Sequence, residues 1–473
     1  MTSTDILTRI TSSIDILIRA ADKYEGLFPS LLNLETHEML TEAPPCIPGQ
    51  RRGDRSHLGS NLIHDEITLL AMYGLGAALN RSDYAEAADR YLKSFATHCT
   101  DTVTGLFPWG EHAFWHLVDD GIGNSSRYHD PNSTNPAIHD QLRQAPTWLW
   151  AKLWEFNPRS VERFAEGLDW HWRDRTPDEY SRHGEIEVKQ RPEDYEFCSY
   201  DFPRHGGFYI QAWAFAYVRT GREDFKRQVV RMMDHWQRNR LESGLLPYCS
   251  RVTERVTAFY RVHACAQTMG FAAGLWDSAD IVEAKEPELA SRMRGEAAAY
   301  AGALFSAPHD VENGVFYLAH KPGDKERDTA MPIWGSVYGV WPASSIASLC
   351  LHTFRQTQDE RFLRFSEAVG SFYLKSPFPK DVAVPANDAG LALEMLADLY
   401  EITGAKAWLD GGLALAEKLM QTYMDGDLPR GAAGIDWYES QMGPSFLLYG
   451  LARIALLASD RQHCPLQAEY TTR

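Results

Sequence analysis

The sequence predicts an all-α fold, a closed (α/α) toroid of about seven helical hairpins, with six as the alternative count. The first observation is a turn signature in which acidic and aromatic residues open a charged helix, at 80–84, 220–225, 357–362 and 403–408. The aromatic residues of successive copies are separated by close to three, three and one periods of about 46 residues. A regular period indicates a repeat architecture, because one hairpin cannot bury its apolar face alone.

The second observation is that two kinds of helix alternate along the chain. Helices that are apolar on nearly all sides and rich in small residues are expected at 63–80, 138–155, 206–220, 257–277, 341–356, 387–403 and 440–458. Amphipathic helices with one charged face are expected at 3–24, 84–99, 158–174, 222–239, 286–305, 359–374 and 405–424. Helices that are apolar all round are buried, so the first set should form an inner ring and the second an outer ring.

Short extended connectors are the third observation. Segments such as 105–108 and 244–247 place glycine beside proline, which ends a helix and favours a turn. Long loops then precede the inner helices, at 30–60, 109–136, 176–204, 317–340 and 429–439. Long insertions on one rim of a repeat ring indicate the functional rim. We therefore expect a single catalytic domain over 1–473, whose N-terminal helix closes the ring.

Composition excludes several classes of function. The net charge of −17 disfavours nucleic acid as a partner. The stretch 1–24 carries charges at short intervals, so it does not read as a signal peptide, and no apolar run reaches the length of a membrane span. Seven scattered cysteines without a CxxC pair suit a reducing compartment. These features predict a cytoplasmic protein, or a periplasmic or secreted one if the sequence is trimmed at its start, and they leave the oligomeric state open.

Polar residues gather where the inner helices are expected to begin, so they should converge on one pit. Helix N-termini and a locally basic stretch at 182–263 favour a ligand that carries carboxylates. Arg204, Arg255 and Arg261 are the strongest cationic candidates. His205 precedes two glycines, where a ligand can approach closely, and Tyr260 lies one hairpin further on.

A histidine and a tyrosine that face one sugar ring suit proton abstraction beside a carboxylate and protonation of the leaving oxygen. An arginine that neutralises the carboxylate lowers the cost of the enolate-like intermediate. This is the set required for β-elimination of a uronic acid glycoside. The catalytic candidates are His205, Tyr260, Arg255 and Asn135. The candidates for substrate binding are Trp109, His112, His139, Glu196, Arg204, Arg261 and Trp334.

Metal binding has weaker support in the sequence. Histidines and carboxylates come within reach of one another by topology, but they show no close-spaced ligand pair such as HExxH. Those residues are His57, His64, Asp65, Glu111, His112 and His139. The sequence therefore predicts no metal and no other cofactor.

The chain resembles the polysaccharide lyases built on an (α/α)7 barrel, of the type that cleaves glucuronan and alginate. The segments 181–184 and 201–207 and the later Tyr260 carry this resemblance. It implies a His/Tyr pair as base and acid, here His205 and Tyr260. More loosely, it implies Asn135, Glu196 and Arg255 near the substrate carboxylate.

The leading hypothesis is a lyase that acts on a uronate polysaccharide or oligosaccharide, and three alternatives remain. A glycoside hydrolase of the unsaturated uronyl type would use Asp65, Glu66, Glu196 or Asp201 as its acid. A sugar epimerase or isomerase would use paired histidines such as His139 and His205. The last alternative is a sugar-binding protein without catalysis.

Overall fold

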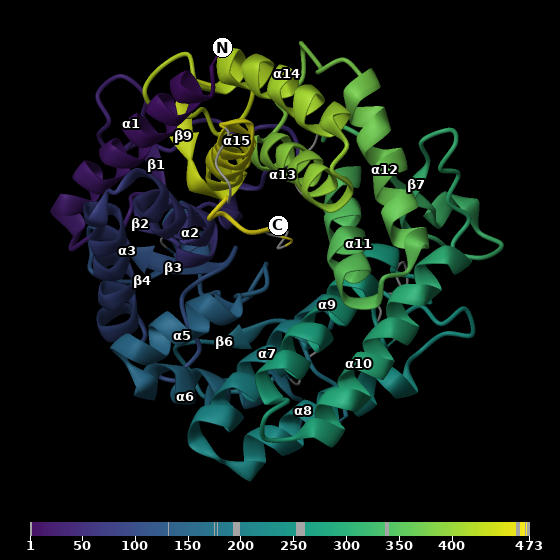
Figure 1. The fold of residues 1–473 in the computed structure, drawn as a ribbon. Coiled ribbons are helices and arrows are strands. Elements are labelled where there is room, and N and C mark those ends of the chain that lie inside the picture. Colours follow the sequence, from purple (N-terminus) through teal and green to yellow (C-terminus); the bar gives the residue numbers. More distant parts are fainter. Residues whose placement is uncertain are drawn as a thin grey trace.

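The computed structural model describes residues 2–130, 132–174, 176, 178–192, 199–251, 261–335, 340–459, 464–468 and 470. Within these residues the long helices pair as seven hairpins around a ring (Figure 1). The inner helices are α2 (Leu62–Leu79), α5 (Thr147–Phe156), α7 (Pro203–Thr220), α9 (Cys265–Val282), α11 (Ala343–Thr357), α13 (Ala386–Thr403) and α15 (Pro444–Ala458). The outer helices are α1 (Ser3–Ala21), α3 (Ser82–Ser94), α6 (Pro158–Gly167), α8 (Glu223–Arg238), α10 (Pro287–Gly302), α12 (Glu360–Lys375) and α14 (Lys406–Tyr423). The predicted all-α toroid is confirmed.

The turn signature ends four of the seven inner helices, α2, α7, α11 and α13, with a residue in the left-handed conformation. Asn80, Gly221, Gln358 and Gly404 have φ values of 58°, 74°, 56° and 67°. A left-handed residue at this position stops a helix and lets the chain reverse into the next one. The recurring signature is therefore the C-terminal cap of these inner helices.

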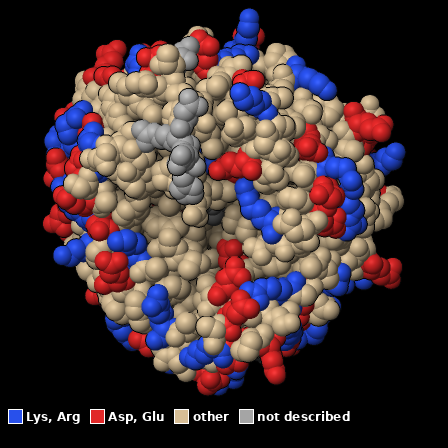
Figure 2. Space-filling model, in the orientation of Figure 1, with Lys and Arg blue, Asp and Glu red and all other residues tan. Residues whose placement is uncertain are grey.

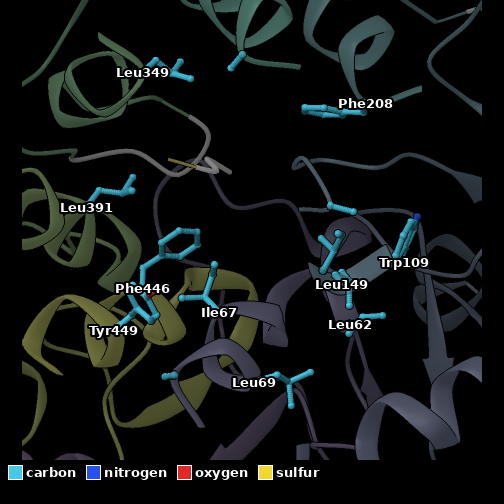
Figure 3. Packing of buried hydrophobic residues seen from close by; sticks show 14 of the residues in the cluster. Leu62, Ile67, Leu69, Trp109, Leu149, Phe208, Leu349, Leu391, Phe446 and Tyr449 are labelled. Carbon is cyan, nitrogen blue, oxygen red and sulfur yellow. The ribbon is translucent and has the colours of Figure 1, made fainter. Parts of the chain in front are cut away.

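Burial separates the two rings as the patterns predict. Helix α7 buries nearly every side chain from Pro203 to Tyr217, while α8 buries one stripe that includes Phe225, Val229 and Trp236. Such a stripe is typical of a helix that packs with one face on a core. Figure 3 shows buried apolar side chains from several inner helices facing a shared core, among them Ile67, Leu149, Phe208, Leu349, Leu391 and Phe446.

Helix α2 is long and apolar enough to cross a membrane by length and composition, which differs from the expectation that no such segment exists. It lies in the inner ring, and two thirds of that stretch is buried within the protein. The core position accounts for its composition. Figure 2 shows that acidic and basic side chains are interspersed around a central hollow on the face that it displays.

Short antiparallel strands join the rim loops. The pairs are β1 (Leu31–Asn33) with β9 (Trp437–Glu439), β3 (Ala113–His116) with β2 (Gly59–Ser60) and β4 (Gly121–Asn124), β5 (Ile138–His139) with β6 (Gly184–Glu185), and β7 (Phe316–Ala319) with β8 (Thr329–Met331). The loop between β4 and β5 also holds the short α4 (Ser125–His129). These strands fix the loops that the sequence assigned to the functional rim.

Two inner helices begin later than expected. The second was expected from 138, but α5 begins at Thr147 after Pro146, which has extended dihedrals and cannot donate a backbone hydrogen bond. The preceding residues 138–146 instead run across the rim, beginning with β5. The fourth was expected from 257, but α9 begins at Cys265.

The two ends of the chain meet at the ring closure. Helix α1 packs on α15, and β1 pairs with β9. Arg55 and Glu439 form a fully buried double hydrogen bond of 2.6 and 2.7 Å between the N-terminal rim loop and β9. Beyond α15, the tail lies at the centre of the ring in Figure 1, where the Tyr470 ring stacks on His352 at 4.0 Å.

Candidate active site

A buried carboxylate, Asp140, lies at the centre of a charged cluster on the rim. It directly follows β5, and β5 pairs His139 with Gly184 of β6. This register brings His183, the residue before β6, to the side of Asp140. A parallel bridge between Asp140 and Gly110 brings the Glu111–His112 loop to the same place.

Four nitrogen-bearing side chains contact the Asp140 carboxylate. Its Oδ2 lies 3.2 Å from His183 Nε2, 3.5 Å from His112 Nε2 and 3.6 Å from Arg182 Nε. His205 Nε2 donates to Asp140 Oδ1 at 3.1 Å. Neither Asp140 nor His205 has any exposed side-chain surface. We call these residues, with Glu111 and Asp54, the Asp140 cluster.

Two further carboxylates lie near His112. Asp54 Oδ1 lies 3.6 Å from His112 Nδ1, and Glu111 Oε2 lies 4.0 Å from His112 Nε2. Arg51 pairs with both carboxylates. Burial raises the pKa of Asp54 to about 6, and burial followed by the charges of Asp54 and Asp140 raises the pKa of Glu111. Crowded carboxylates of this kind favour the binding of a cation.

The histidines of the cluster are neutral at pH 7. The pKa values of His112, His183 and His205 are lowered to about 4, mainly by burial, although the charge of Asp140 acts in the opposite direction. The pKa of Asp140 lies well below its usual range because Arg182 and His183 outweigh the opposing effect of burial. The cluster therefore presents neutral imidazoles and an ionised carboxylate, the protonation states that metal ions bind.

The residues present fit a divalent cation. In each of two groups, His112–Asp140–His183 and Asp54–Glu111–His112, one ligand atom per residue lies within 4.8 Å of the others. Two ligands about 2.1 Å from one tetrahedral ion lie about 3.4 Å apart, close to the spacings measured around Asp140 Oδ2. The hydrogen bond from His205 would orient Asp140, as outer-shell partners of metal ligands do.

A hydrogen-bonded chain beneath the cluster fixes its position. Trp109 Nε1 donates to His139 Nε2 at 3.0 Å, and His139 Nδ1 lies 2.9 Å from His171 Nε2. His171 Nδ1 in turn lies 2.8 Å from the carbonyl of Ser181, the residue before Arg182. Each ring nitrogen in this chain has a partner, so both histidines support the cluster from within the core.

Gly110 makes the close approach to Asp140 feasible. Its φ is +126°, and a Cβ atom there would lie 1.9 Å from the carbonyl oxygen of Asp140. A side chain would therefore push the bridge apart. This position requires glycine for both conformation and space.

The structure brings three of the sequence-predicted residues together. His112 and His205 contact Asp140, and burial lowers the pKa of Arg204 to about 10 while the nearby charges of Asp140 and Glu111 act in the opposite direction. The Arg204 guanidinium lies 4.8 Å from the centre of the Trp341 ring. Arg204 thus remains a cation at pH 7 beside the cluster.

Other predicted residues lie elsewhere. Trp109 and His139 have no exposed surface and belong to the chain described above, so neither offers the expected face to a sugar. Trp334 is 8% exposed and packs edge-on against Tyr373 and Phe378. Asn135 is exposed, and its backbone bonds to residues of its own loop.

Arg261 is exposed and lines a separate cleft with His263. Tyr260, Arg255 and Glu196 lie outside the described residues, so their roles stay predictions.

Sequence reasoning did not select Asp54, Asp140, Arg182 and His183, and it considered Glu111 only as a possible metal ligand. Arg182 and His183 stand in the segment that carries the family resemblance, and Asp140 follows His139 in a rim segment. Each segment had therefore been recognised as part of the rim or of the family resemblance, but the spacing between the segments matched no known metal-binding motif. The expectation of no metal rested on that missing spacing, and the ring brings together residues, distant in sequence, that could hold an ion.

Comparison with protein families gives one match. Residues 49–205, about a third of the chain, match the model of a family described as periplasmic pectate lyase. The segment contains every member of the Asp140 cluster. No curated protein matches the sequence.

Solved structures with a similar fold act on carbohydrates. An unsaturated glucuronyl hydrolase specific for heparin is 12% identical, with 96% of this chain and 97% of that chain covered and a TM-score of 0.47. A sugar epimerase from a ruminal bacterium is 10% identical, with 98% and 100% covered and a TM-score of 0.49. A GH76 α-mannanase from Bacteroides thetaiotaomicron is 11% identical, with 95% of each chain covered and a TM-score of 0.47. Likeness at this level carries no argument about activity.

The family match also corrects the predicted location. Its description as periplasmic contradicts the cytoplasmic location that the sequence favoured. Scattered cysteines were a poor guide, because a core of this size does not depend on disulfides in any compartment. The matched segment and the charged cluster within it indicate an enzyme that acts on polysaccharides.

Proposed function

We propose that this protein is a polysaccharide lyase that cleaves a uronate polymer by β-elimination, with pectate as its first candidate substrate. The observation that carries the proposal is the Asp140 cluster, flanked by Arg182 and Arg204, inside the segment that matches the pectate lyase model. A uronate polymer carries a carboxylate on each sugar. Cations at the reacting sugar stabilise the negative charge that develops when its C5 proton leaves.

Arg182 and Arg204 are the proposed partners of the substrate carboxylate. The Arg182 side chain is 14% exposed, and its Nη1 donates to Ser199 Oγ at 2.6 Å. It also lies over the Phe202 ring at 4.7 Å, which fixes the plane of the guanidinium. A planar, fixed guanidinium matches the geometry of a carboxylate and binds it with two parallel hydrogen bonds.

His112, Asp140 and His183 would hold a divalent cation. Such an ion, when bound, supplies charge stabilisation to the carboxylate of the reacting sugar. The role of His205 changes accordingly. Because its Nε2 is bonded to Asp140 and its side chain has no exposed surface, we assign it as a positioning residue rather than the base.

Proton transfer is the step for which we propose Tyr260. The reaction removes a proton from C5, breaks the C4–O4 bond, protonates the leaving oxygen and leaves a C4–C5 double bond. Tyr260 was predicted as the acid beside His205 as the base; with His205 assigned to positioning, we propose that the Tyr260 phenol shuttles the proton between carbon and oxygen. It lies outside the described residues and keeps that role as a proposal.

The test is the ultraviolet absorbance of the new conjugated double bond. The wild-type protein is mixed with polygalacturonate, glucuronan and alginate, and with a polygalacturonate whose carboxyl groups have been reduced. We expect absorbance to rise on a charged polymer and not on the reduced one. A chelator should abolish the rise, and an added divalent cation should restore it.

Variants connect the signal to the cluster. Asp140→Asn and His183→Ala should lose the absorbance signal, whereas Asp410→Asn on the exposed surface of α14 should keep it. The lyase proposal is refuted if wild type produces no unsaturated product from any of the three polymers. Absorbance that falls on an unsaturated oligosaccharide would indicate a hydrolase. A flat signal with a changed monosaccharide would indicate an epimerase.

A further inference from the structure

A second cleft opens on the rim between the end of α8 and the start of α9. It has a volume of about 540 Å³ and is lined by Arg238, Arg240, Ser243, Arg261, His263 and Pro322, among others. Volumes of about 300–1,000 Å³ are typical of sites that hold a small ligand. The outer-to-inner connectors run along this rim, so the cleft lies on the same side of the ring as the Asp140 cluster.

The charge of the cleft is positive in a protein whose net charge is −17. Arg240 has a structural task, since it donates to the carbonyl groups of Gly244 and Ala299 and lies over the Tyr300 ring. Arg238 is different, because it pairs with Asp178 at 3.7 Å and both side chains are more than half exposed. Exposed pairs of this kind are weak and exchange readily for another anion.

Arg261 stands at the mouth of the cleft in a conformation that arginine rarely adopts. Its φ is +54°, in the left-handed region, which costs about 1 kcal/mol or more for a residue with a Cβ atom. Backbone bonds just after it hold the segment, with Val262 accepting from Tyr248 and His263 exchanging bonds with His320. Strain that the surrounding structure maintains is a feature of ligand sites.

A short series of contacts joins the cleft to the Asp140 cluster. Ser250, in the wall of the cleft, donates its backbone N–H to Asp201 at 3.1 Å. The next residue, Arg251, donates to the carbonyl of Ser199. Ser199 accepts from Arg182 through its hydroxyl, so one residue, Ser199, connects the segment behind the cleft to the cluster.

We infer that this arginine cleft (Arg238, Arg261 and His263) is a distal subsite that binds further carboxylate-bearing sugars of the same polymer. The inference rests on the proposed function, because it is that substrate which carries a carboxylate on each unit. A polymer that extends from the Asp140 cluster past Ser199 toward Ser250 would place its next acidic units against the arginines. Because only a long substrate reaches from the Asp140 cluster to the cleft, complementary charge in the cleft strengthens the binding of long substrates and not of short ones.

The test compares chain lengths in direct binding. Calorimetric titration measures the affinity of wild type for trigalacturonate and octagalacturonate. The variant is Arg238→Ala/Arg261→Ala, and Arg240 is left in place because of its structural bonds. The matched control, Arg159→Ala/Arg294→Ala, removes the same charge from exposed pairs of α6 and α10. The single variant Arg238→Glu is added because an exposed position tolerates it without loss of folding.

We expect wild type to bind the octamer more tightly than the trimer, and the variant to lose about fivefold or more of its octamer affinity, the effect of two exposed charge contacts. Arg238→Glu should show a similar loss, and the control should stay within about twofold of wild type. A carboxyl-reduced octamer should bind all forms equally. Octamer affinities that agree within about twofold between variant and control overturn the inference.

The outcomes separate the two proposals. If wild type cleaves polygalacturonate but both arginine variants bind the octamer as tightly as wild type, the subsite proposal is refuted and the lyase proposal is kept. If the octamer binds through the arginines but no unsaturated product forms, the lyase fails and an anionic carbohydrate site remains.

Discussion

Asp65 gives the sharpest prediction about stability. It lies in the first turn of α2 with 1% exposure, and its Oδ2 accepts a 2.8 Å hydrogen bond from Tyr91. Burial raises its pKa from 3.8 to about 7, more than the Tyr91 bond lowers it. Between these values the folded protein keeps a proton that the unfolded chain has lost. Stability from this group is therefore fully present below pH 3.8 and falls as pH rises toward 7.

The size of the effect follows from the width of that window. The pKa of Asp65 is raised by about three units, and one unit corresponds to about 1.4 kcal/mol. About two of these units fall between pH 5 and pH 7. Asp65 should therefore cost the wild type about 3 kcal/mol of unfolding free energy between pH 5 and pH 8. Asp65→Asn removes the charge but keeps an oxygen that accepts from Tyr91. The advantage of the variant over wild type should grow by about 3 kcal/mol over this range.

Denaturant unfolding at pH 5, 6.5 and 8 measures this difference. Asp410→Asn, on the exposed surface of α14, is the control and should differ equally from wild type at all three pH values. An Asp65→Asn advantage that changes by less than about 0.5 kcal/mol between pH 5 and pH 8 would refute the assignment of Asp65 as a buried acid.

Three other perturbations have defined outcomes. His205→Leu should weaken divalent cation binding by about 10–100-fold in a calorimetric titration, whereas His205→Asn, which keeps a donor, should lose less. Gly110→Ala should lower turnover about 100-fold by displacing the cluster, while Gly323→Ala, also at positive φ but with open space around it, should leave turnover unchanged. Glu439→Gln should cost about 3–5 kcal/mol in thermal unfolding, because it leaves Arg55 buried without its charged partner; a loss below about 1 kcal/mol would contradict this.

The ring could be predicted from the sequence because its signals are local. Each turn signature ends an inner helix within a few residues of the expected place, as at Gly221 and Gly404. The stretch 138–146 was assigned to a helix as the first part of the expected inner helix 138–155, but proline at 146 and the pairing of β5 with β6 prevent a helix there. The local pattern of apolar and charged residues determines whether a helix belongs to the inner or the outer ring. Pairing between strands of different loops determines the path of the rim loops.

The candidate site was predictable only in part, because its members come from separate loops. His112, Arg204 and His205 were chosen as polar residues on the correct rim, and they lie beside Asp140. Trp109 was chosen as an aromatic beside polar residues, but its side chain points into the core. Sequence identifies the rim on which a residue lies, while the direction of its side chain depends on pairing between loops.

The ring closure has a consequence for how the chain folds during synthesis. Helix α1, with its apolar stripe of Ile10, Ile14 and Leu17, is synthesised before the other helices of the ring, and its partner α15 is synthesised after them. At about 5–20 residues per second, roughly 20–90 s pass before the partner is available. The stripe is exposed to chaperones and to other nascent chains throughout that interval. A circular permutant that starts at α15 would make the closing pair its first hairpin and should remove the delay.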